Sequence, residues 1–97
     1  MTEGIIARRY LVTGRVQGVG YRNFVEHLAG KIGVDGYVRN RRNGSVEVLG
    51  IGTPEKLLVL RRGLQKGPVM ARVSGVSEEP SAVELRYIGN FTIEFTE

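Results

Sequence analysis

Two stretches of this sequence carry apolar residues at the spacing of an amphipathic helix, and short β-prone segments flank each of them. The first stretch places six residues along one helical face: Tyr21, Phe24, Val25, Leu28, Ala29 and Ile32. In the second, Thr53 suits the N-cap and Pro54 the first helical position, and a leucine stripe follows at Leu57, Leu60 and Leu64. We therefore expect one helix from Tyr21 to Gly33 and another from Pro54 to Gly67-Pro68.

The segments around these helices have the composition of strands. Extended structure is predicted for Ile5–Arg15, Tyr37–Arg39, Ser45–Leu49, Arg72–Ser77, Val83–Tyr87 and Phe91–Phe95. Asn43-Gly44 is typical of a tight hairpin, and Glu78-Glu79-Pro80 is interpreted as a charged turn. The order β-α-β-β-α-β, with a short extra strand, predicts an α+β fold. In this ferredoxin-like sandwich two helices cover one face of a mainly antiparallel sheet.

A chain of 97 residues holds one modest core, so residues 1–97 are expected to form a single domain. The sequence has no cysteine, which excludes disulfide bonds, thiol nucleophiles and thiolate metal sites. No apolar stretch is long enough to span a membrane, and the first residues lack the pattern of a secretion signal. We therefore expect a cytoplasmic protein that does not bind membranes.

The basic character of the chain comes from one residue type. The net charge is +4, and eleven arginines stand against three lysines. The guanidinium group forms paired hydrogen bonds with carboxylate and phosphate oxygens, so this bias favours an anionic partner, either a small phosphate or a nucleic-acid backbone. A solvated basic surface explains the charge equally well.

The segment Gly14–Arg22 joins the first predicted strand to the first predicted helix. Amide groups at a helix N-terminus lack intrahelical partners, so a glycine-bearing loop at this place can surround an anion. Arg22 lies in the first helical turn, where two parallel N–H groups would complete the binding site. From its residues alone, the segment also fits a plain glycine-rich connection with a surface arginine.

Two common phosphate-binding loops are excluded at this segment. A P-loop requires Lys-Ser or Lys-Thr after the glycine, where this chain has Tyr21-Arg22. A dinucleotide fingerprint requires a third glycine at position 23, which is Asn23.

A second notable segment ends the next predicted strand at Asn40, beside a basic hairpin. Taken alone, Asn40 is best interpreted as an amide that caps the turn. Arg39, Arg41 and Arg42 either draw an anion toward the hairpin or are simply solvated, and the sequence leaves this open.

Together the two segments resemble the signature motifs of the acylphosphatases, small enzymes with the same order of elements. The motif Gly-x-Val-Gln-Gly-Val-x-aromatic-Arg matches Gly14–Arg22, and Gly-aromatic-Val-basic-Asn matches Gly36–Asn40, with Gly44, Val46 and Gly52 following at the family spacing. Two residues depart from the usual pattern: Tyr21 replaces phenylalanine, and Asn43 replaces the aspartate of many bacterial members. Both belong to packing or turn positions.

The resemblance implies hydrolysis of acyl phosphates to a carboxylate and inorganic phosphate, with no metal or cofactor. It implies two catalytic residues, Arg22 holding the phosphoryl oxygens and Asn40 orienting the attacking water. Backbone amides complete the phosphate site at Gln17, Gly18, Val19, Gly20 and Tyr21. A neutral amide takes up no proton near neutral pH, so the proton of the water passes to the phosphoryl oxygens. The leaving carboxylate has a conjugate acid of pKa about 4 and needs no general acid.

Two alternatives belong to other functional classes. One is a non-catalytic, anion-binding or regulatory domain of the acylphosphatase type. The other is an RNA-binding module, because such modules share this topology and stack bases on aromatic residues of the central strands. Here Val46–Leu49 has no aromatic residue and the first strand offers only Tyr10. We therefore expect no nucleic-acid partner, and a monomer that acts on a small molecule.

Overall fold

The computed structural model describes residues 4–97, and residues 1–3, for which the sequence predicts no secretion signal, lie outside the described part. The elements follow in the order β1 (Ile6–Arg15), α1 (Tyr21–Ile32), β2 (Asp35–Asn40), β3 (Val46–Gly52), α2 (Pro54–Lys66), β4 (Arg72–Ser81), η1 (Leu85–Tyr87) and β5 (Phe91–Ile93). The predicted order β-α-β-β-α-β is confirmed, and both helices begin at their predicted residues.

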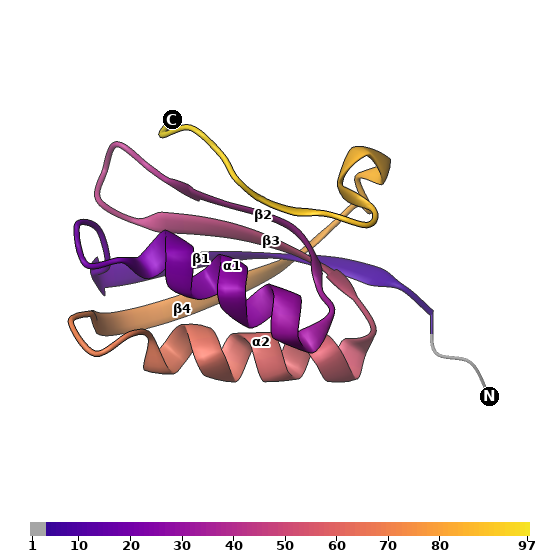
Figure 1. Ribbon diagram of the computed structural model, residues 1–97, viewed down its shortest axis with the longest axis horizontal. Helices are drawn as coiled ribbons and strands as arrows, with labels where there is room; N and C mark the ends of the chain where they lie inside the picture. The colour runs from indigo at the N-terminus through magenta and orange to yellow at the C-terminus, as the bar shows by residue number, and fades with distance from the viewer. Residues whose placement is uncertain (1–3) are drawn as a thin grey trace.

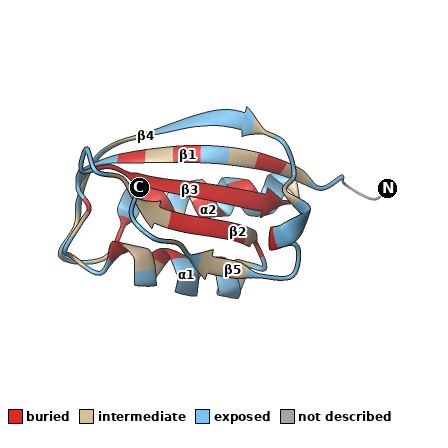
Figure 2. Cartoon of the chain, turned by 90° about the horizontal axis from the view of Figure 1, so that it is seen from above, coloured by how far each residue is buried: buried red, intermediate tan, exposed pale blue. Residues whose placement is uncertain are grey.

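The strands form a single five-stranded sheet in the order β4-β1-β3-β2-β5. β1 pairs antiparallel with β3 and β4, β2 pairs antiparallel with β3, and only β5 runs parallel to its neighbour β2. Both helices lie against the same face of this sheet (Figure 1). The opposite face, turned toward the viewer in Figure 2, is covered by neither α1 nor α2 and is called the open face below. The predicted ferredoxin-like α+β fold is thus the observed one.

The main core lies between the sheet and the two helices. Alternate strand residues point toward the helices, among them Tyr10, Val12, Val38 and Val48, and they pack against the buried stripes of α1 and α2. The central strand β3 is buried along its entire length, whereas the edge strand β4 is mostly exposed (Figure 2). A smaller cluster covers part of the open face and consists of Ala7, Tyr37, Leu49, Ile51 and Tyr87.

Tyr21 opens α1 and joins the two helices. Its ring is buried, and its hydroxyl donates a hydrogen bond of 2.6 Å to the carbonyl oxygen of Leu64. That carbonyl is one of the last four of α2, and these carbonyls receive no hydrogen bond from an N–H group of the helix itself. Burial raises the pKa of the Tyr21 hydroxyl well above its usual value, so the group remains a donor. A tyrosine at this position therefore satisfies a helix end that a phenylalanine would not reach.

The prediction of a charged turn at Glu78-Glu79-Pro80 is wrong. β4 continues through these residues to Ser81 and pairs Glu78 with Tyr10 and Glu79 with Arg9. Because β4 is an edge strand, it accommodates Pro80, which has no N–H group for a further partner strand. Ion pairs to arginines of β1 and α2 also hold the two carboxylates in place.

The prediction of extended structure over Val83–Tyr87 is also wrong, because Leu85–Tyr87 forms a turn of 3-10 helix. This turn directs the ring of Tyr87 onto the open face, where it lies 5.2 Å from that of Tyr37, centroid to centroid. β5 ends at Ile93, earlier than the predicted Phe95. The backbone nonetheless continues beside β2, since Glu94 N–H donates to Val38 and Glu97 N–H donates to Asn40, at 2.8 and 3.1 Å.

No helix within residues 4–97 is long and apolar enough to cross a membrane.

Candidate functional site

The connection from β1 to α1 turns through two glycines of left-handed conformation. Gly18 and Gly20 have φ angles of +73° and +78°, which side chains of L-residues rarely adopt. A Cβ atom at either glycine would meet no atom within 4 Å, so backbone strain, not crowding, selects glycine. The first bond of α1 runs from Phe24 N–H to the Gly20 carbonyl oxygen at 3.1 Å. The amide groups of residues 21–23 precede it and have no intrahelical acceptor.

A cavity of about 200 Å³ lies at this helix N-terminus. It is lined by Val16, Gln17, Gly18, Gly20, Tyr21, Arg22, Asn23, Asn40 and Ile93. The fold thus brings Arg22 and Asn40 to the same cavity from α1 and β2. Drug-sized ligands occupy pockets of roughly 300–1,000 Å³, so a cavity of this size suits a smaller group.

Arg22 occupies the first turn of α1, where the helix dipole presents its positive end. It is partly buried, and none of the ion pairs formed among residues 4–97 involves it. No carboxylate of the described residues therefore neutralises its guanidinium group. Free amides, the dipole and this charge together favour an anion in the cavity.

Asn40 is the last residue of β2 and pairs with Val46 of β3. Its side-chain oxygen Oδ1 is buried and has no hydrogen-bond partner. A buried acceptor of this kind is costly unless it binds water or a ligand, so it identifies a position for a hydrogen-bond donor in the cavity. The turn-capping role belongs instead to Asn43, whose Oδ1 accepts from the amide and hydroxyl groups of Ser45 at 3.0 and 2.6 Å.

Gln17 connects the loop before α1 to the β2–β3 hairpin through its side chain. Its Nε2 donates to the carbonyl oxygens of Arg41 and Ser45 at 2.7 and 2.8 Å. The sequence motif predicts a role only for the backbone amide of this residue. The side-chain contacts fix the hairpin, and Asn40 with it, relative to the loop.

The structure does not treat all predicted loop residues alike. Val19 does not line the cavity and packs against the main core. Three further residues line the cavity that the motif does not predict: Val16, Asn23 and Ile93. Asn23 follows Arg22 in the first turn of α1, and this position in the sequence is sufficient to predict that it lies near the cavity. Ile93 arrives through the parallel pairing of β5 with β2, which no local pattern reveals.

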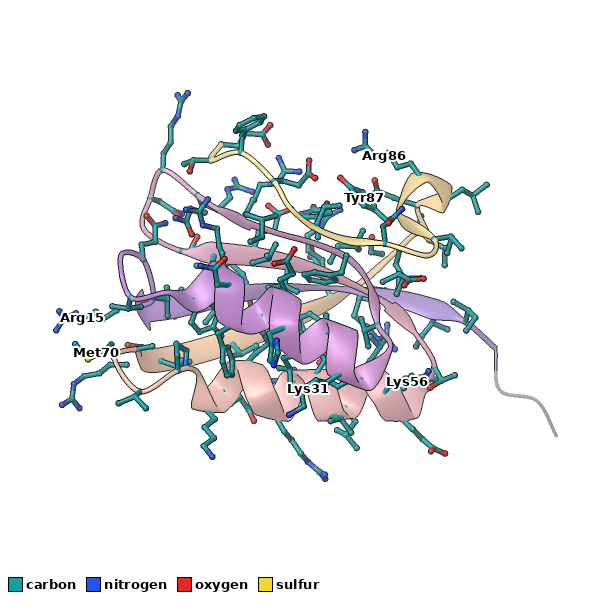
Figure 3. All side chains as sticks on the ribbon, in the orientation of Figure 1. Arg15, Lys31, Lys56, Met70, Arg86 and Tyr87 are labelled. Carbon is teal, nitrogen blue, oxygen red and sulfur yellow. The ribbon has the colours of Figure 1, made fainter. Side chains whose placement is uncertain are left out.

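The site lies at one end of the molecule, away from the open face of the sheet. The loop before α1 is found at the end where the side chains of Arg15 and Met70 project (Figure 3). Across residues 4–97, no three side chains of His, Cys, Asp or Glu are grouped to hold a metal ion. The polar groups of the cavity are N–H donors, a guanidinium and carboxamides, a set that suits an anion.

Comparison with known proteins matches the family model named Acylphosphatase to residues 8–93. A protein of Koribacter versatilis (strain Ellin345), named acylphosphatase, is 53% identical over 96 residues, which cover 99% of this chain and 86% of that protein. The crystal structure of acylphosphatase from Bacillus subtilis superposes with a TM-score of 0.86 at 33% identity, over 94% of this chain and 99% of that one. The crystal structure of full-length HypF, in a phosphate- and nucleotide-bound form, matches with a TM-score of 0.88 at 26% identity. The match covers 100% of this chain but only 13% of the HypF chain.

Proposed function

The chain belongs to the acylphosphatase family and hydrolyses acyl phosphates, and we propose that the cavity at the N-terminus of α1 is where it does so. One observation carries this proposal. The guanidinium-bearing Arg22 and the partnerless Oδ1 of Asn40 line the same small cavity, beside the free amides of the first turn of α1. The substrate is a small acyl phosphate and one product is inorganic phosphate.

In this proposal the phosphoryl group binds where the amides and the guanidinium converge. The backbone N–H groups of residues 17–22 and two N–H groups of Arg22 donate to the phosphoryl oxygens. The transition state spreads its negative charge over these oxygens, so donors that are held in place before the reaction stabilise it and lower the barrier. The loop glycines permit this arrangement, because Gly18 and Gly20 adopt left-handed φ angles, and successive backbone N–H groups in such a turn can converge on an anion.

The carboxamide of Asn40 then holds the attacking water. Its Oδ1 accepts a hydrogen bond from the water and orients a lone pair toward phosphorus, in line with the leaving group. A neutral carboxamide does not take the proton, which moves to a phosphoryl oxygen as the P–O bond to the acyl group breaks. The carboxylate leaves with both bonding electrons, and its conjugate acid has a pKa of about 4, so no general acid is required.

We propose that the chain acts as a single, monomeric, cytoplasmic domain that does not bind nucleic acid. RNA-recognition modules stack bases on aromatic rings of the central strands at the sheet surface. Here the only aromatic residue of β1 and β3 is Tyr10, which is 1% exposed and lies under the helices with its hydroxyl 3.4 Å from the Leu57 carbonyl oxygen. The competing interpretation is a non-catalytic or regulatory domain of the acylphosphatase type, since the chain is also similar to a small part of HypF. Absence of turnover would favour this interpretation.

Hydrolysis of benzoyl phosphate in ¹⁸O-labelled water with excess chelator tests the proposal. We expect turnover that is insensitive to chelator, with one labelled oxygen in phosphate and none in benzoate. Arg22→Ala should abolish it, whereas Arg62→Ala, which removes an exposed arginine of α2, should not. Label in benzoate would refute attack at phosphorus, and loss of turnover with chelator would refute a reaction without metal.

A further inference from the structure

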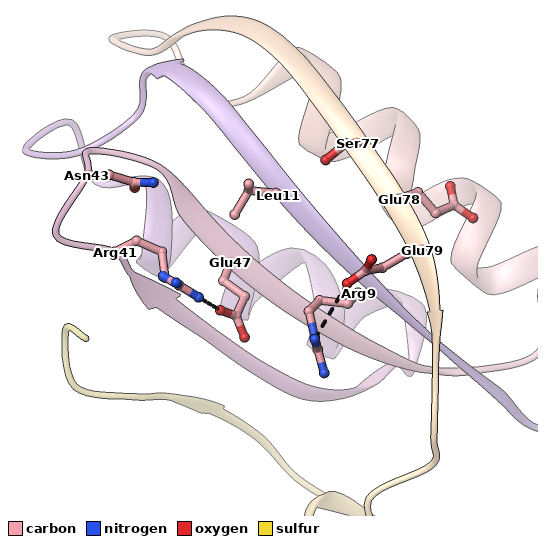
Figure 4. Close-up of a pocket in the computed structure, with 8 residues that line it drawn as sticks. All are labelled: Arg9, Leu11, Arg41, Asn43, Glu47, Ser77, Glu78 and Glu79. Atoms are coloured by element: carbon pink, nitrogen blue, oxygen red, sulfur yellow. Dashed lines mark hydrogen bonds and ion pairs between the residues drawn. The ribbon is translucent and has the colours of Figure 1, made fainter.

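A buried acidic residue lies on the opposite side of the sheet from the proposed active site. Glu47 stands in β3, is 7% exposed, and faces the open side together with Leu49 and Ile51. The hydroxyl of Tyr37 and the guanidinium of Arg41 both donate hydrogen bonds to its carboxylate. Figure 4 shows the Arg41–Glu47 pair within a second cavity, of about 300 Å³.

The contacts of Glu47 all fall on one face of β2 and its continuation. Tyr37, Arg39 and Arg41 alternate along this strand with Val38 and Asn40, so the two sets point to opposite faces of the sheet. Arg39 is the cross-strand partner of Glu47. The carboxylate of Glu47 therefore binds side chains on the open face of β2 and its continuation. Asn40, at the end of the same strand, points to the opposite face.

Arg41 links this carboxylate to the proposed active site. Its side chain is held by Glu47, and its carbonyl oxygen accepts the hydrogen bond from Gln17 in the loop before α1. Its own N–H group donates to the Ser45 carbonyl oxygen at 2.8 Å. The residue directly after Asn40 is thus fixed by its bond to Glu47 and by hydrogen bonds of its own backbone, and of these only the bond to Glu47 comes from a strand of the sheet.

The network suits an ionised carboxylate. Burial alone would raise the pKa of Glu47, but hydrogen bonds from Tyr37 and Arg41, with the charges of Arg39 and Arg41, outweigh it and lower the pKa below its ordinary value. For its hydrogen-bond donor Tyr37, burial and the bond to Glu47 raise the pKa of the hydroxyl. The two pKa shifts agree with a neutral tyrosine hydroxyl that donates to a charged carboxylate.

We propose that Glu47 is a positioning residue for acyl phosphate hydrolysis. Through Arg41 it fixes the end of β2, so that the carboxamide of Asn40 points into the cavity at the orientation needed to hold water. The inference rests on the proposed role of Asn40. Glu47 does not line the cavity of Asn40 and acts on the reaction only through the end of β2, so its effect is confined to the turnover step.

The same cavity supplies a matched control. Glu79, in β4, also lines it and pairs with Arg9 of β1 at 3.5 Å. This pair is more exposed than the pair of Glu47 and Arg41 and has no bond to β2. Glu79→Gln therefore removes a carboxylate from the same face of the sheet while leaving the end of β2 untouched.

A double-mutant cycle with benzoyl phosphate separates positioning from general destabilisation. Glu47→Gln should lower kcat about tenfold, as expected for a small misplacement of a catalytic group, with KM and the inhibition constant for phosphate changed less than twofold. Added to Asn40→Ala, it should change kcat less than twofold, and Glu79→Gln should be silent in both backgrounds. A tenfold loss in both backgrounds, or a loss confined to KM, overturns the positioning role. A normal kcat in Asn40→Ala itself overturns the role of Asn40 in the proposed function, and this inference with it.

A second measurement does not depend on activity. In ¹⁵N-labelled protein, the side-chain amide signals of Asn40 should shift in Glu47→Gln and remain in place in Glu79→Gln. Tyr37→Phe, which removes one donor and keeps the carboxylate, provides the same test if Glu47→Gln does not fold. Unshifted Asn40 signals in a folded Glu47→Gln or Tyr37→Phe protein would contradict the proposal.

Discussion

The side-chain amide of Gln17 donates a hydrogen bond of 2.7 Å to the carbonyl oxygen of Arg41. This bond joins the loop that precedes α1 to the residue that follows Asn40, and so connects the two halves of the proposed active site. A second bond from the same nitrogen to the Ser45 carbonyl oxygen, at 2.8 Å, prevents the hairpin from rotating about the first.

Gln17→Ala should therefore reduce activity more than stability. Each carbonyl keeps a backbone donor, Gly44 N–H to Arg41 at 3.1 Å and Arg41 N–H to Ser45 at 2.8 Å, which limits the cost in unfolding free energy. We expect that cost to be about 1 kcal/mol and kcat/KM to fall about tenfold. Urea unfolding and steady-state kinetics measure the two effects, with Gln65→Ala, an exposed glutamine of α2, as control. Unchanged kinetics in a folded Gln17→Ala would contradict the connecting role.

Arg22→Lys should be nearly as damaging as Arg22→Ala. A lysine retains the charge but presents a single ammonium group, which cannot form the two parallel bonds of a guanidinium. We expect kcat/KM to fall at least about 100-fold in both variants, the loss typical of a donor that stabilises a transition-state oxyanion. A lysine variant with activity near wild type would show that charge alone is sufficient.

Tyr21→Phe should destabilise the protein without changing kcat. It removes the buried hydroxyl that donates to Leu64 at 2.6 Å, and the expected loss of unfolding free energy is about 1–2 kcal/mol. Tyr10→Phe is the matched control, because its hydroxyl lies 3.4 Å from the Leu57 carbonyl oxygen and contributes less. Equal losses in the two variants, measured by urea unfolding, would refute the particular importance of the Tyr21 bond.

Glu47 should make stability depend on pH in acid. Its pKa is lowered in the folded protein, where hydrogen bonds and nearby arginines outweigh burial, relative to an ordinary value of 4.5. A lowered carboxyl pKa contributes stability above the unfolded value, and this contribution is lost as the pH falls through the folded value. The stability advantage of wild type over Glu47→Gln should therefore be constant near neutral pH and shrink below about pH 5. Urea unfolding at neutral pH and in acid compares the two proteins, and an advantage independent of pH would contradict ionisation of Glu47.

The order of elements was predictable because it depends on local patterns. The helical stripe from Tyr21 to Ile32 and the cap formed by Thr53, whose side chain accepts from Lys56 N–H, each act over a few residues. The course of β4 was not predictable, since Glu78-Glu79-Pro80 has turn composition and only its place at the sheet edge makes it a strand. Tertiary pairing overrides local preference at such positions.

The candidate site divides in the same way. Arg22 and Asn40 were identified by motifs whose residues stand close together in the sequence. The contribution of Ile93 and the buried network of Glu47 depend on which strands become neighbours and on which face each side chain points to. Glu47 in particular follows a hairpin whose polar sequence predicts an exposed segment. Its burial and its contacts with Tyr37 and Arg41 are evident only from the structure.

The division of work between Arg22 and Asn40 is tested most directly by measuring kcat and the inhibition constant for inorganic phosphate in Asn40→Ala. If Asn40 holds the water while Arg22 and the loop amides hold the phosphoryl group, kcat for benzoyl phosphate should fall about 100-fold with the phosphate inhibition constant unchanged. Arg22→Ala should instead weaken phosphate inhibition strongly. An inhibition constant in Asn40→Ala that worsens in step with kcat would place Asn40 in the phosphate-binding shell and contradict this account.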